Sequence, residues 1–380
     1  MADNKDKKVL KVPDLRFPEF TGEWQCKAIG KVAPLQRGFD LPTQNLVEGI
    51  YPVIYSNGIL QHHDKYKCEA PGLITGRSGT IGKFTYIDSG FYWPHNTSLW
   101  VTDFCGNCPK FIYYLYQTVH IEQFSTGSGV PTLNRNDVHR YKTFVPTAIV
   151  EQEKIAKFLS ILDERIATQN KIIERYKSLI RGINQYAFTN TGINYKLGEI
   201  CEIRSGYSGN QLTLKNGLKV SRIETISEHK VNMERVGYVA PFESSENYRL
   251  QIGDILFSNI NSVEYIGNTA FIDKYYNLYH GMNLLRLIPK KELVIPFYLY
   301  LVLNTNRLLN HFKTVCNKAV SQASINQTEL GKTIVLIPNL MNQNRICELF
   351  QTLYTKLEAE RYFISLLQGQ KQHLLRQMFI

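Results

Sequence analysis

The sequence contains no apolar segment long enough to cross a membrane. Its longest apolar run, Leu293–Leu303, covers 11 residues and includes Pro296, whereas a membrane-spanning helix needs about 20, so we expect a helix of a protein core there. The N-terminus is polar and lacks the apolar stretch of a signal peptide. The seven cysteines are scattered and odd in number, which favours reduced thiols in a cytoplasmic protein.

The motifs of several enzyme classes are also missing. Residues 76–83 come close to a phosphate-binding P-loop, but the spacing before Gly82 is wrong, and Phe84 stands where a Ser or Thr would hold magnesium. No Gly-x-Gly-x-x-Gly opens a helix after an expected strand, and the absence of any Pro-Pro dipeptide excludes the catalytic loop of amino-methyltransferases. Neither Gly-x-Ser-x-Gly nor His-Glu-x-x-His occurs. We therefore expect no catalytic residue and no cofactor bound by this chain.

Cys105 and Cys108 have the spacing of a zinc knuckle. A structural zinc site needs four ligands, and no second pair of Cys or His residues follows them in the sequence. His95 and His120 could complete a site only if the fold happened to bring them there. A turn with two free thiols explains the pair better, so we expect no metal site.

The composition indicates a folded protein whose charge suits a polyanionic partner. The chain has 380 residues, of which 43% are apolar, and 44 basic against 33 acidic residues give a net charge of +11. This length suits two domains or three small ones. Because the basic excess is shared almost equally by the two halves, with no charged tail, any surface that binds a polyanion is expected twice.

The second half of the sequence repeats the first. Lys27–Val32 resembles Tyr195–Ile200. Further matching pairs are Gly38 with Gly206, Asn134 with Asn326, Pro146 with Pro338 and Gln152 with Gln343. A two-copy repeat of this length indicates one structural frame used twice. It divides the chain into four segments, which are 1–147, 148–190, 191–337 and 338–380.

Segments 1–147 and 191–337 have a mixed α/β character. Short β-branched and aromatic runs bounded by Gly, Asn, Ser and Pro predict strands at Tyr51–Tyr55, Lys219–Ile223, Ile252–Ser258 and Lys332–Pro338. One helix per copy is expected, at Lys110–Phe124 and Phe297–Phe312. The predicted fold class is therefore α+β, with two mixed α/β domains separated by helical segments in a pseudo-two-fold repeat.

Segments 148–190 and 338–380 are helical by their periodicity. Apolar residues recur in alternating steps of three and four over four heptads in each segment. The first stripe includes Ile155, Leu159, Leu162, Ile166, Gln169, Ile173 and Ile180, and the second includes Ile346, Phe350, Leu353, Leu357, Glu360, Ile364 and Leu367. Two coincident stripes of this length predict that the helices pair as an antiparallel coiled coil. The alternative is that each helix packs on its own globular core.

Gln169 and Glu360 interrupt the two stripes at the same position of the repeat. In an antiparallel pair related by an approximate two-fold axis, equivalent positions near that axis face each other. We hypothesise that the two residues form a polar layer that helps to fix the register, with Glu360 accepting a hydrogen bond from the Gln169 amide. Two tolerated polar positions are the alternative.

Taken with the repeat, several segments resemble a known family. Similarity to the specificity subunits of bacterial type I restriction–modification systems is found at residues 13–24 (PDLRFPEFTGEW) and 127–134 (GSGVPTLN), and more specifically from Pro146 to Ile166, which includes EQEKIAKFL at 151–159. The resemblance covers the whole chain, including the repeat. The second copy departs from the pattern at residues 339–345, which match more loosely.

The resemblance implies a specificity subunit without catalytic activity. Two target-recognition domains, 1–147 and 191–337, would each read one half of a bipartite sequence in double-stranded DNA, and the helices 148–190 and 338–380 would fix the gap between the halves. The helical regions would also dock two modification subunits that use S-adenosylmethionine. Restriction subunits in the full complex would add chemistry that needs ATP and Mg. The chain itself would bind no cofactor.

Residues that read DNA are expected in polar loops at matching places in the two copies, because Arg suits guanine and Asn or Gln suits adenine. In the first domain the candidates are Gln36, Arg37, Arg77, Ser78, Lys83, Ser128, Asn134 and Arg135. In the second they are Arg204, Arg222, Asn259, Asn261, Ser262, Lys318, Ser321, Gln322 and Asn326. We expect about a third of them to touch DNA, since most surface residues of these types are only solvated.

Two other functions are open at this point. The chain could be the recognition subunit of another type of DNA-modifying assembly, which the copurifying subunits would reveal. It could also be a coiled-coil scaffold for other proteins with no DNA role, which salt-sensitive DNA binding would exclude. A coiled-coil pair alone would leave apolar residues such as Phe158 and Ile172 exposed on the outer helix faces, so we expect the chain not to be stable without partners.

Overall fold

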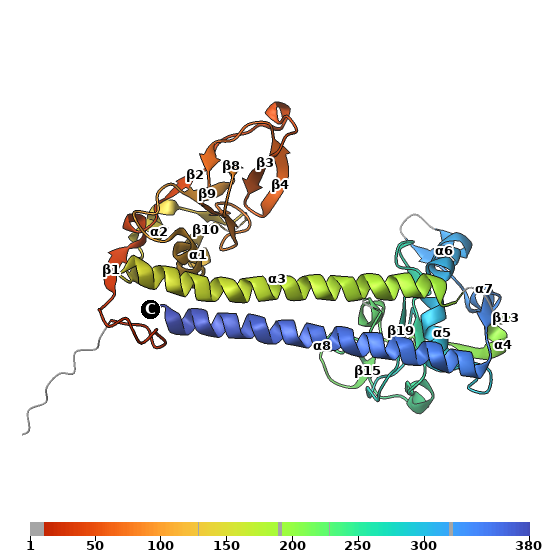
Figure 1. Cartoon of the computed structure of the whole chain (residues 1–380). Coiled ribbons are helices and arrows are strands. Elements are labelled where there is room, and N and C mark those ends of the chain that lie inside the picture. The colour runs from red at the N-terminus through yellow and green to blue at the C-terminus, as the bar shows by residue number, and fades with distance from the viewer. Residues whose placement is uncertain (1–10, 128, 189–191, 228, 319–321) are drawn as a thin grey trace, which may run out of the picture. The chain divides into compact units, whose positions relative to one another are not determined.

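The chain folds into two compact units. The computed structural model describes residues 11–380 except 128, 189–191, 228 and 319–321. The first unit comprises residues 1–171 and 361–380, and the second comprises residues 172–360. Two long helices, α3 (Ile149–Tyr186) and α8 (Leu340–Met378), each contribute one part to the first unit and one part to the second (Figure 1).

The first unit contains two four-stranded sheets. One has the strand order β2-β9-β6-β7 (Leu35–Arg37, Ser98–Val101, Gly72–Gly76, Phe84–Ile87), and the other has the order β4-β3-β8-β5 (Gly58–His63, Tyr51–Tyr55, Phe91–Pro94, Cys68–Glu69). Two further pairings join β1 (Gln25–Ala28) to β12 (Lys142–Val145) and β10 (Ser125–Thr126) to β11 (Thr132–Leu133). Helices α1 (Pro109–Thr118) and α2 (Arg135–Arg140) precede α3, and 3-10 helices cover Ile29–Lys31, Thr43–Asn45 and Ile121–Phe124.

Helix α1 forms the centre of the core in the first unit. It begins with Pro109, which suits the first helical position because an N–H group there would have no partner within the helix and proline has none. Phe111 and Tyr114 of α1 are buried together with Leu159 of α3 and Leu374 of α8. Lys371 of α8 forms an ion pair of 2.7 Å with Asp163 of α3. Within this unit the start of α3 therefore lies beside the end of α8, with the two helices antiparallel.

The second unit has the same kind of architecture. Its four-stranded sheet has the order β14-β20-β17-β19 (Cys201–Ser205, Leu285–Pro289, Ile255–Phe257, Thr269–Phe271), and a three-stranded sheet has the order β18-β22-β21 (Ile260–Asn261, Ala323–Ser324, Asn317–Lys318). Strand β15 (Leu218–Val220) pairs with β16 (Gly237–Val239), and β13 (Ile193–Lys196) pairs with β23 (Ile334–Ile337). The helices are α4 (Leu197–Ile200), α5 (Pro296–Leu303), α6 (Asn306–Val315) and α7 (Gln327–Gly331), with 3-10 helices at Ile223–Ile226 and Ser245–Tyr248.

The frame of the two units repeats as the sequence predicts. The pair β1–β12 corresponds to β13–β23, and each second member leads into a long helix. Gly38 and Gly206 also have the same role, because each precedes a residue that makes a parallel bridge, Phe39 to His95 and Tyr207 to Gly281. A Cβ atom on either glycine would overlap the partner's carbonyl oxygen, so only glycine allows this close approach.

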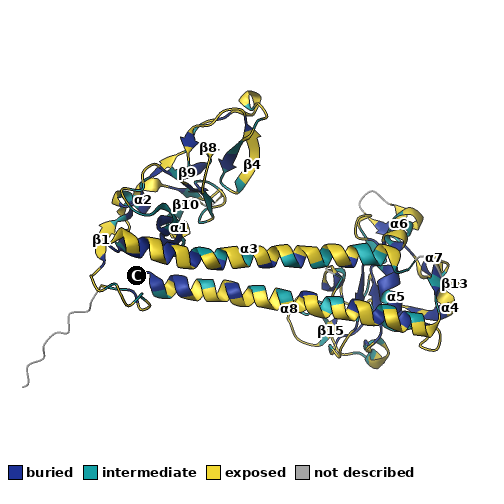
Figure 2. Cartoon of the chain, in the orientation of Figure 1, coloured by how far each residue is buried: buried dark blue, intermediate teal, exposed yellow. Residues whose placement is uncertain are grey.

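The predicted heptad stripes coincide with the buried faces of α3 and α8. None of the fourteen stripe residues is exposed, and Figure 2 shows buried and half-buried positions recurring along both helices. Buried members are Ile155, Leu159, Leu162, Gln169, Ile173, Ile180, Phe350, Leu357 and Leu367, and half-buried members are Ile166, Ile346, Leu353, Glu360 and Ile364. The stripes are therefore the packing faces of the helices, whereas the polar layer of Gln169 and Glu360 stays a hypothesis.

Neither helix predicted within the mixed segments is one continuous helix over its predicted range. The prediction over Lys110–Phe124 is wrong after Thr118, because His120 has a left-handed φ of 51° and a 3-10 helix follows. The prediction over Phe297–Phe312 is wrong because two helices occupy this range, α5 and α6. They are separated where the Thr305 hydroxyl accepts a hydrogen bond from the Leu308 N–H at 3.4 Å, which caps α6.

The predicted strands and core helix occur, all but one of them over a shorter range than predicted. Strand β3 covers all of Tyr51–Tyr55, whereas the other three predicted strands are reduced to Leu218–Val220, Ile255–Phe257 and Ile334–Ile337. The apolar run that begins at Leu293 contains α5, five of whose eight residues are buried. Across the described ranges, no helix combines the length and the apolarity that a bilayer crossing requires.

Candidate nucleic-acid interface

Five candidate residues of the first unit line one polar pocket. The pocket has a volume of about 620 Å³. The five are Gln36, Arg37, Arg77, Asn134 and Arg135. They come from the end of β2, the end of β6 and the start of α2. The fold therefore gathers candidates that are up to 99 residues apart in the sequence.

Backbone hydrogen bonds place Arg77 in this pocket. It follows β6, and its N–H donates to the Thr97 carbonyl oxygen at 2.9 Å, while its own carbonyl oxygen accepts from the Leu133 N–H at 2.8 Å. The next residue, Ser78, forms an antiparallel bridge with Thr132. The end of β6 is thus tied to the β10–β11 hairpin. The Arg77 side chain is half-buried on the pocket wall.

Helix α2 supplies the opposite side of the pocket and is locked to β2. The Asn134 side chain accepts a hydrogen bond from the Asn136 N–H at 3.0 Å and so caps the helix that starts with Arg135. From the same helix, His139 Nε2 accepts from the Leu35 N–H at 2.8 Å. Burial, and then the charge of Arg135, lower the pKa of His139. A neutral ring is the form that can accept this hydrogen bond.

The charge balance of the pocket favours an anionic ligand. Three arginines line it, Arg37, Arg77 and Arg135, against one carboxylate, Asp40. Asp40 lies 3.1 Å from the Arg37 guanidinium and also accepts a hydrogen bond from the Asn96 amide. Because Arg37 and Asp40 are both exposed, their attraction is screened by water and leaves Arg37 free to exchange partners. Nucleic-acid phosphates and guanine edges are ligands that such a pocket suits.

The second unit assembles its candidates on the three-stranded sheet. The Ile325 N–H donates to the Asn259 carbonyl oxygen at 2.9 Å, just as the Leu133 N–H donates to Arg77 in the first unit. Strand β22 pairs with both β18 and β21, so Ala323 is the register partner of Asn261 and of Lys318. Ser262 and Gln322 flank these strands and are exposed. Equivalent strand pairs, β10–β11 and β21–β22, therefore lie beside candidate residues in both units.

Two arginines of the second unit lie on other elements. Arg204 is on β14, where its guanidinium donates to both carboxylate oxygens of Glu202 at 2.6 and 3.1 Å. Arg222 lies 3.4 Å from Glu224 and lines a pocket of about 360 Å³ together with Asn210, Gln211 and Asn283. The sequence prediction missed these three amides. The loop of Asn210 and Gln211 begins two residues after Gly206, the counterpart of Gly38, which was the available signal for these two amides. Asn283 lies in a different part of the chain.

Several candidates already have a structural role. Asn326 caps α7 through a hydrogen bond from the Glu329 N–H at 2.8 Å, in parallel with the cap at Asn134. The Asn259 Oδ1 atom is buried and has no hydrogen-bond partner among the described residues, so it is poorly placed to meet a base. Lys83 is exposed and reaches the Asn57 carbonyl oxygen at 3.5 Å. Ser128 and Ser321 lie outside the described residues.

Cys105 and Cys108 lie at the start of α1. Cys105 is exposed, Cys108 is half-buried, and both are free thiols. Burial raises the pKa of Cys105, and Asp103 adds to the effect. Where the structure describes the chain, no three side chains of His, Cys, Asp or Glu are grouped in a way that could hold a metal ion.

Comparison with known proteins places the chain among proteins of one kind. Residues 21–177 and 193–363 each match the type I restriction modification DNA specificity domain. A relative named for the specificity subunit of type I restriction enzyme MjaX, from Methanocaldococcus jannaschii, is 38% identical over 188 residues, which span 48% of this chain and 44% of the relative. The MjaVIII specificity subunit of the same organism is 25% identical over 66% of this chain and 65% of its own length.

Two solved structures have a similar fold along nearly the whole chain. The S subunit of a type I restriction–modification system from M. genitalium has a TM-score of 0.62 and 18% identity, over 97% of this chain and 99% of that one. A chain from a study of complex assembly and conformational transition of the type I R-M system has a TM-score of 0.58 and 16% identity, over 93% and 96% of the two chains.

Proposed function

The chain belongs to the type I restriction–modification DNA specificity family, and we propose that it reads a bipartite DNA target without catalysing a reaction. The observation that carries the proposal is the doubling of the site. The family's domain matches twice. In each unit a hairpin region is also hydrogen-bonded to a residue that follows a central strand, Arg77 after β6 and Asn259 after β17. Two different surfaces on one repeated frame suit two different half-sites.

The side chains at these surfaces support recognition of DNA. The three arginines of the first pocket can neutralise phosphates or form paired hydrogen bonds with guanine. In the second unit Asn261, Gln322 and Lys318 gather at the hairpin, and amides of this kind suit adenine. Each half-site would thus be read by a different set of side chains.

We propose that α3 and α8 pair as an antiparallel coiled coil that sets the gap between the half-sites. The buried stripes support this pairing. Helix α3 has 38 residues, which corresponds to about 57 Å at 1.5 Å per residue. A spacer of this length can separate two readers by about one turn of DNA, roughly 34–36 Å.

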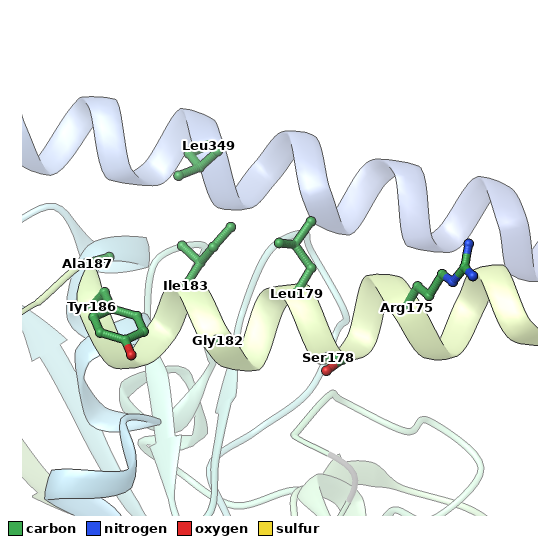
Figure 3. Close-up of a pocket in the computed structure, with 8 residues that line it drawn as sticks. All are labelled: Arg175, Ser178, Leu179, Gly182, Ile183, Tyr186, Ala187 and Leu349. Atoms are coloured by element: carbon green, nitrogen blue, oxygen red, sulfur yellow. The ribbon is translucent and has the colours of Figure 1, made fainter.

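Exposed apolar residues of the long helices support docking of two copies of one partner. Phe158 of α3 is 38% exposed and its repeat counterpart Leu349 of α8 is 44% exposed. In the second unit a cavity of about 740 Å³ is lined by Leu179, Ile183 and Leu349, whose side chains lie between the two helix ribbons in Figure 3. Repeated apolar surface of this kind marks protein interfaces.

The proposed partners carry the chemistry. Two modification subunits would use S-adenosylmethionine, and restriction subunits would use ATP and Mg. The complex would act on DNA in the cytoplasm. This chain would supply the sequence preference and no cofactor.

A genome-wide map of adenine methylation tests the proposed function. Cells that contain the modification subunits are compared with and without this chain, by native long-read sequencing. We expect a bipartite motif that occurs only when the chain is present. No new motif despite copurifying modification subunits would contradict the proposal and favour a scaffold role.

Arg77 provides a test at the level of one residue. We expect Arg77→Ala to weaken binding of the complex to its target by about 1–3 kcal/mol, which is typical of a lost paired contact to a base. Arg140→Ala is the matched control, because Arg140 is an exposed residue of α2 that pairs with Asp137 and does not line the pocket. Binding is measured on duplexes with each base of the half-site varied. An effect of Arg77→Ala no larger than that of the control would exclude Arg77 as a reader.

A further inference from the structure

A buried glutamine joins α3 to the rest of the first unit. Gln152 lies in the first turns of α3 and is 3% exposed. Its Oε1 atom accepts a hydrogen bond from the N–H of Cys108, the N-cap residue of α1, at 2.9 Å. Its Nε2 atom donates to the carbonyl oxygen of Pro146 at 3.0 Å and to Asn107 Oδ1 at 2.9 Å. The amide thus links the start of α3, the start of α1 and the segment that follows β12.

The same junction occurs in the second unit around Gln343, which is fully buried in α8. Its Oε1 atom accepts from the N–H of Ile295, the N-cap residue of α5, at 2.7 Å. Its Nε2 atom donates to the carbonyl oxygens of Pro338 at 2.8 Å and Leu293 at 3.1 Å. Each glutamine therefore accepts from the N-cap residue of a helix and donates to a proline carbonyl oxygen. Only the third partner differs, Asn107 Oδ1 in the first unit and the Leu293 carbonyl oxygen in the second.

The chemistry of the junction requires a primary amide. Cys108 and Ile295 present backbone donors, and Pro146 and Pro338 present backbone acceptors. A side chain that accepts from one and donates to the other at the same time must carry both a carbonyl oxygen and an N–H group. A carboxylate would instead place a second negative oxygen against the proline carbonyl. An apolar side chain would leave buried backbone groups without partners.

We propose that Gln152 and Gln343 are positioning residues that fix the angle between each recognition module and its spacer helix, and so restrict the complex to one gap length. The inference rests on the proposed function. At each junction the chain passes from strand to long helix through a short segment, Pro146–Ala148 or Pro338–Asn339, which by itself leaves the angle adjustable. One base-pair step is about 3.4 Å along the DNA. A small rotation at the junction, acting over the length of a module, shifts its reading loops by a comparable distance.

Methylation of DNA with varied gaps tests the inference. The chain is purified with its modification subunits, and initial methylation rates are measured on duplexes that carry both half-sites with the native gap, one base pair less and one more. The readout is the ratio of the rate at the native gap to the rate at the altered gaps. This ratio does not change when a variant only lowers the amount of active complex.

We expect Gln152→Leu and Gln343→Leu each to lower this ratio about tenfold, because a junction without its buried hydrogen bonds lets the module reach half-sites at the neighbouring gaps. Gln185→Leu and Gln351→Leu are the matched controls, because both glutamines are exposed on the same two helices. An unchanged ratio in Gln152→Leu and Gln343→Leu would overturn the inference, and this includes the case in which the rate falls equally at every gap. A wild-type complex with no bipartite preference would instead overturn the proposed function and the inference with it.

The isosteric variants Gln152→Glu and Gln343→Glu keep the test decisive if the leucine variants do not fold. A protonated carboxyl can accept from Cys108 or Ile295 and donate to Pro146 or Pro338, whereas the carboxylate cannot donate. We expect the ratio of the Glu variants to be low at pH 8 and to recover toward the wild-type ratio as the pH falls to about 6, because burial favours the protonated form. A ratio equal to that of wild type at both pH values would overturn the inference.

Discussion

Replacement of Glu151 by alanine is expected to lower the free energy of unfolding by about 3–5 kcal/mol, the usual loss when one partner of a buried ion pair is removed. Glu151 is 2% exposed. Its two carboxylate oxygens accept hydrogen bonds from the Arg16 guanidinium at 2.6 and 2.8 Å, and Trp24 Nε1 adds a third at 3.1 Å. The variant leaves a nearly buried guanidinium without a counter-charge.

Neighbouring contacts hold the same N-terminal segment against both long helices. The Phe17 ring packs edge-on against Phe158 of α3 at 5.9 Å, with the Lys154 ammonium 4.7 Å from the Phe17 ring centre. The Leu15 N–H donates to the Gln377 carbonyl oxygen of α8 at 2.9 Å. Loss of the Glu151 carboxylate should therefore release residues 11–24 as well as destabilise the core. The second copy has Asn342 at the equivalent position, so this contact is built only once.

Thermal unfolding and limited proteolysis of the chain in its complex check this prediction. Glu153→Ala is the control, because Glu153 is exposed on the same turn of α3. We expect early cleavage within residues 11–24 for the Glu151 variant alone. In a double-mutant cycle, Arg16→Ala combined with Glu151→Ala should cost less than the sum of the two single changes. Additive losses would show that the two side chains act independently, contrary to this account.

The features of the fold that the sequence predicted correctly depend on local sequence patterns. The heptad stripes depend only on spacing within one segment, and all of their residues are buried or half-buried in the structure. The break between α5 and α6 was missed because Asn304 and Thr305 are compatible with a helix by spacing alone. The Asn304 amide donates to Thr269 Oγ1 at 2.7 Å, a partner 35 residues away that no local pattern reveals.

In the candidate site, too, local patterns identified some residues and only the fold revealed others. Gly-rich and polar loops led to Arg77 and Arg135, which the fold brings to one pocket. The helix-capping role of Asn326 was not predicted, although an Asn followed three residues later by Glu329 is a common helix start. By contrast, Asp40 and Asn283 became recognisable only when the fold placed them in the pockets of Arg37 and Arg222.

Acid should destabilise the second unit through His280. This ring is 1% exposed, and one of its nitrogens lies 2.9 Å from the Leu284 carbonyl oxygen. Burial lowers the pKa of His280 to about 4. In the unfolded chain the ring has its ordinary pKa of about 6.5, so below pH 6.5 the unfolded state binds a proton that the folded state does not. The stabilisation is complete above pH 6.5 and is lost as the pH falls toward 4, by up to about 3 kcal/mol.

Other buried groups also contribute to the pH dependence of stability. Burial also lowers the pKa of His229 in the same unit, which adds to the acid sensitivity. Asp254 acts in the opposite direction, because burial raises its pKa despite the Arg286 ion pair at 2.7 Å, so the folded state gains protons there as the pH falls.

Melting temperatures of wild type and His280→Gln between pH 7.5 and 4.5 separate these contributions. Glutamine can still donate to Leu284 but does not titrate, so we expect the variant to lose much less stability in acid. A parallel decline of both proteins would assign the acid sensitivity to other groups.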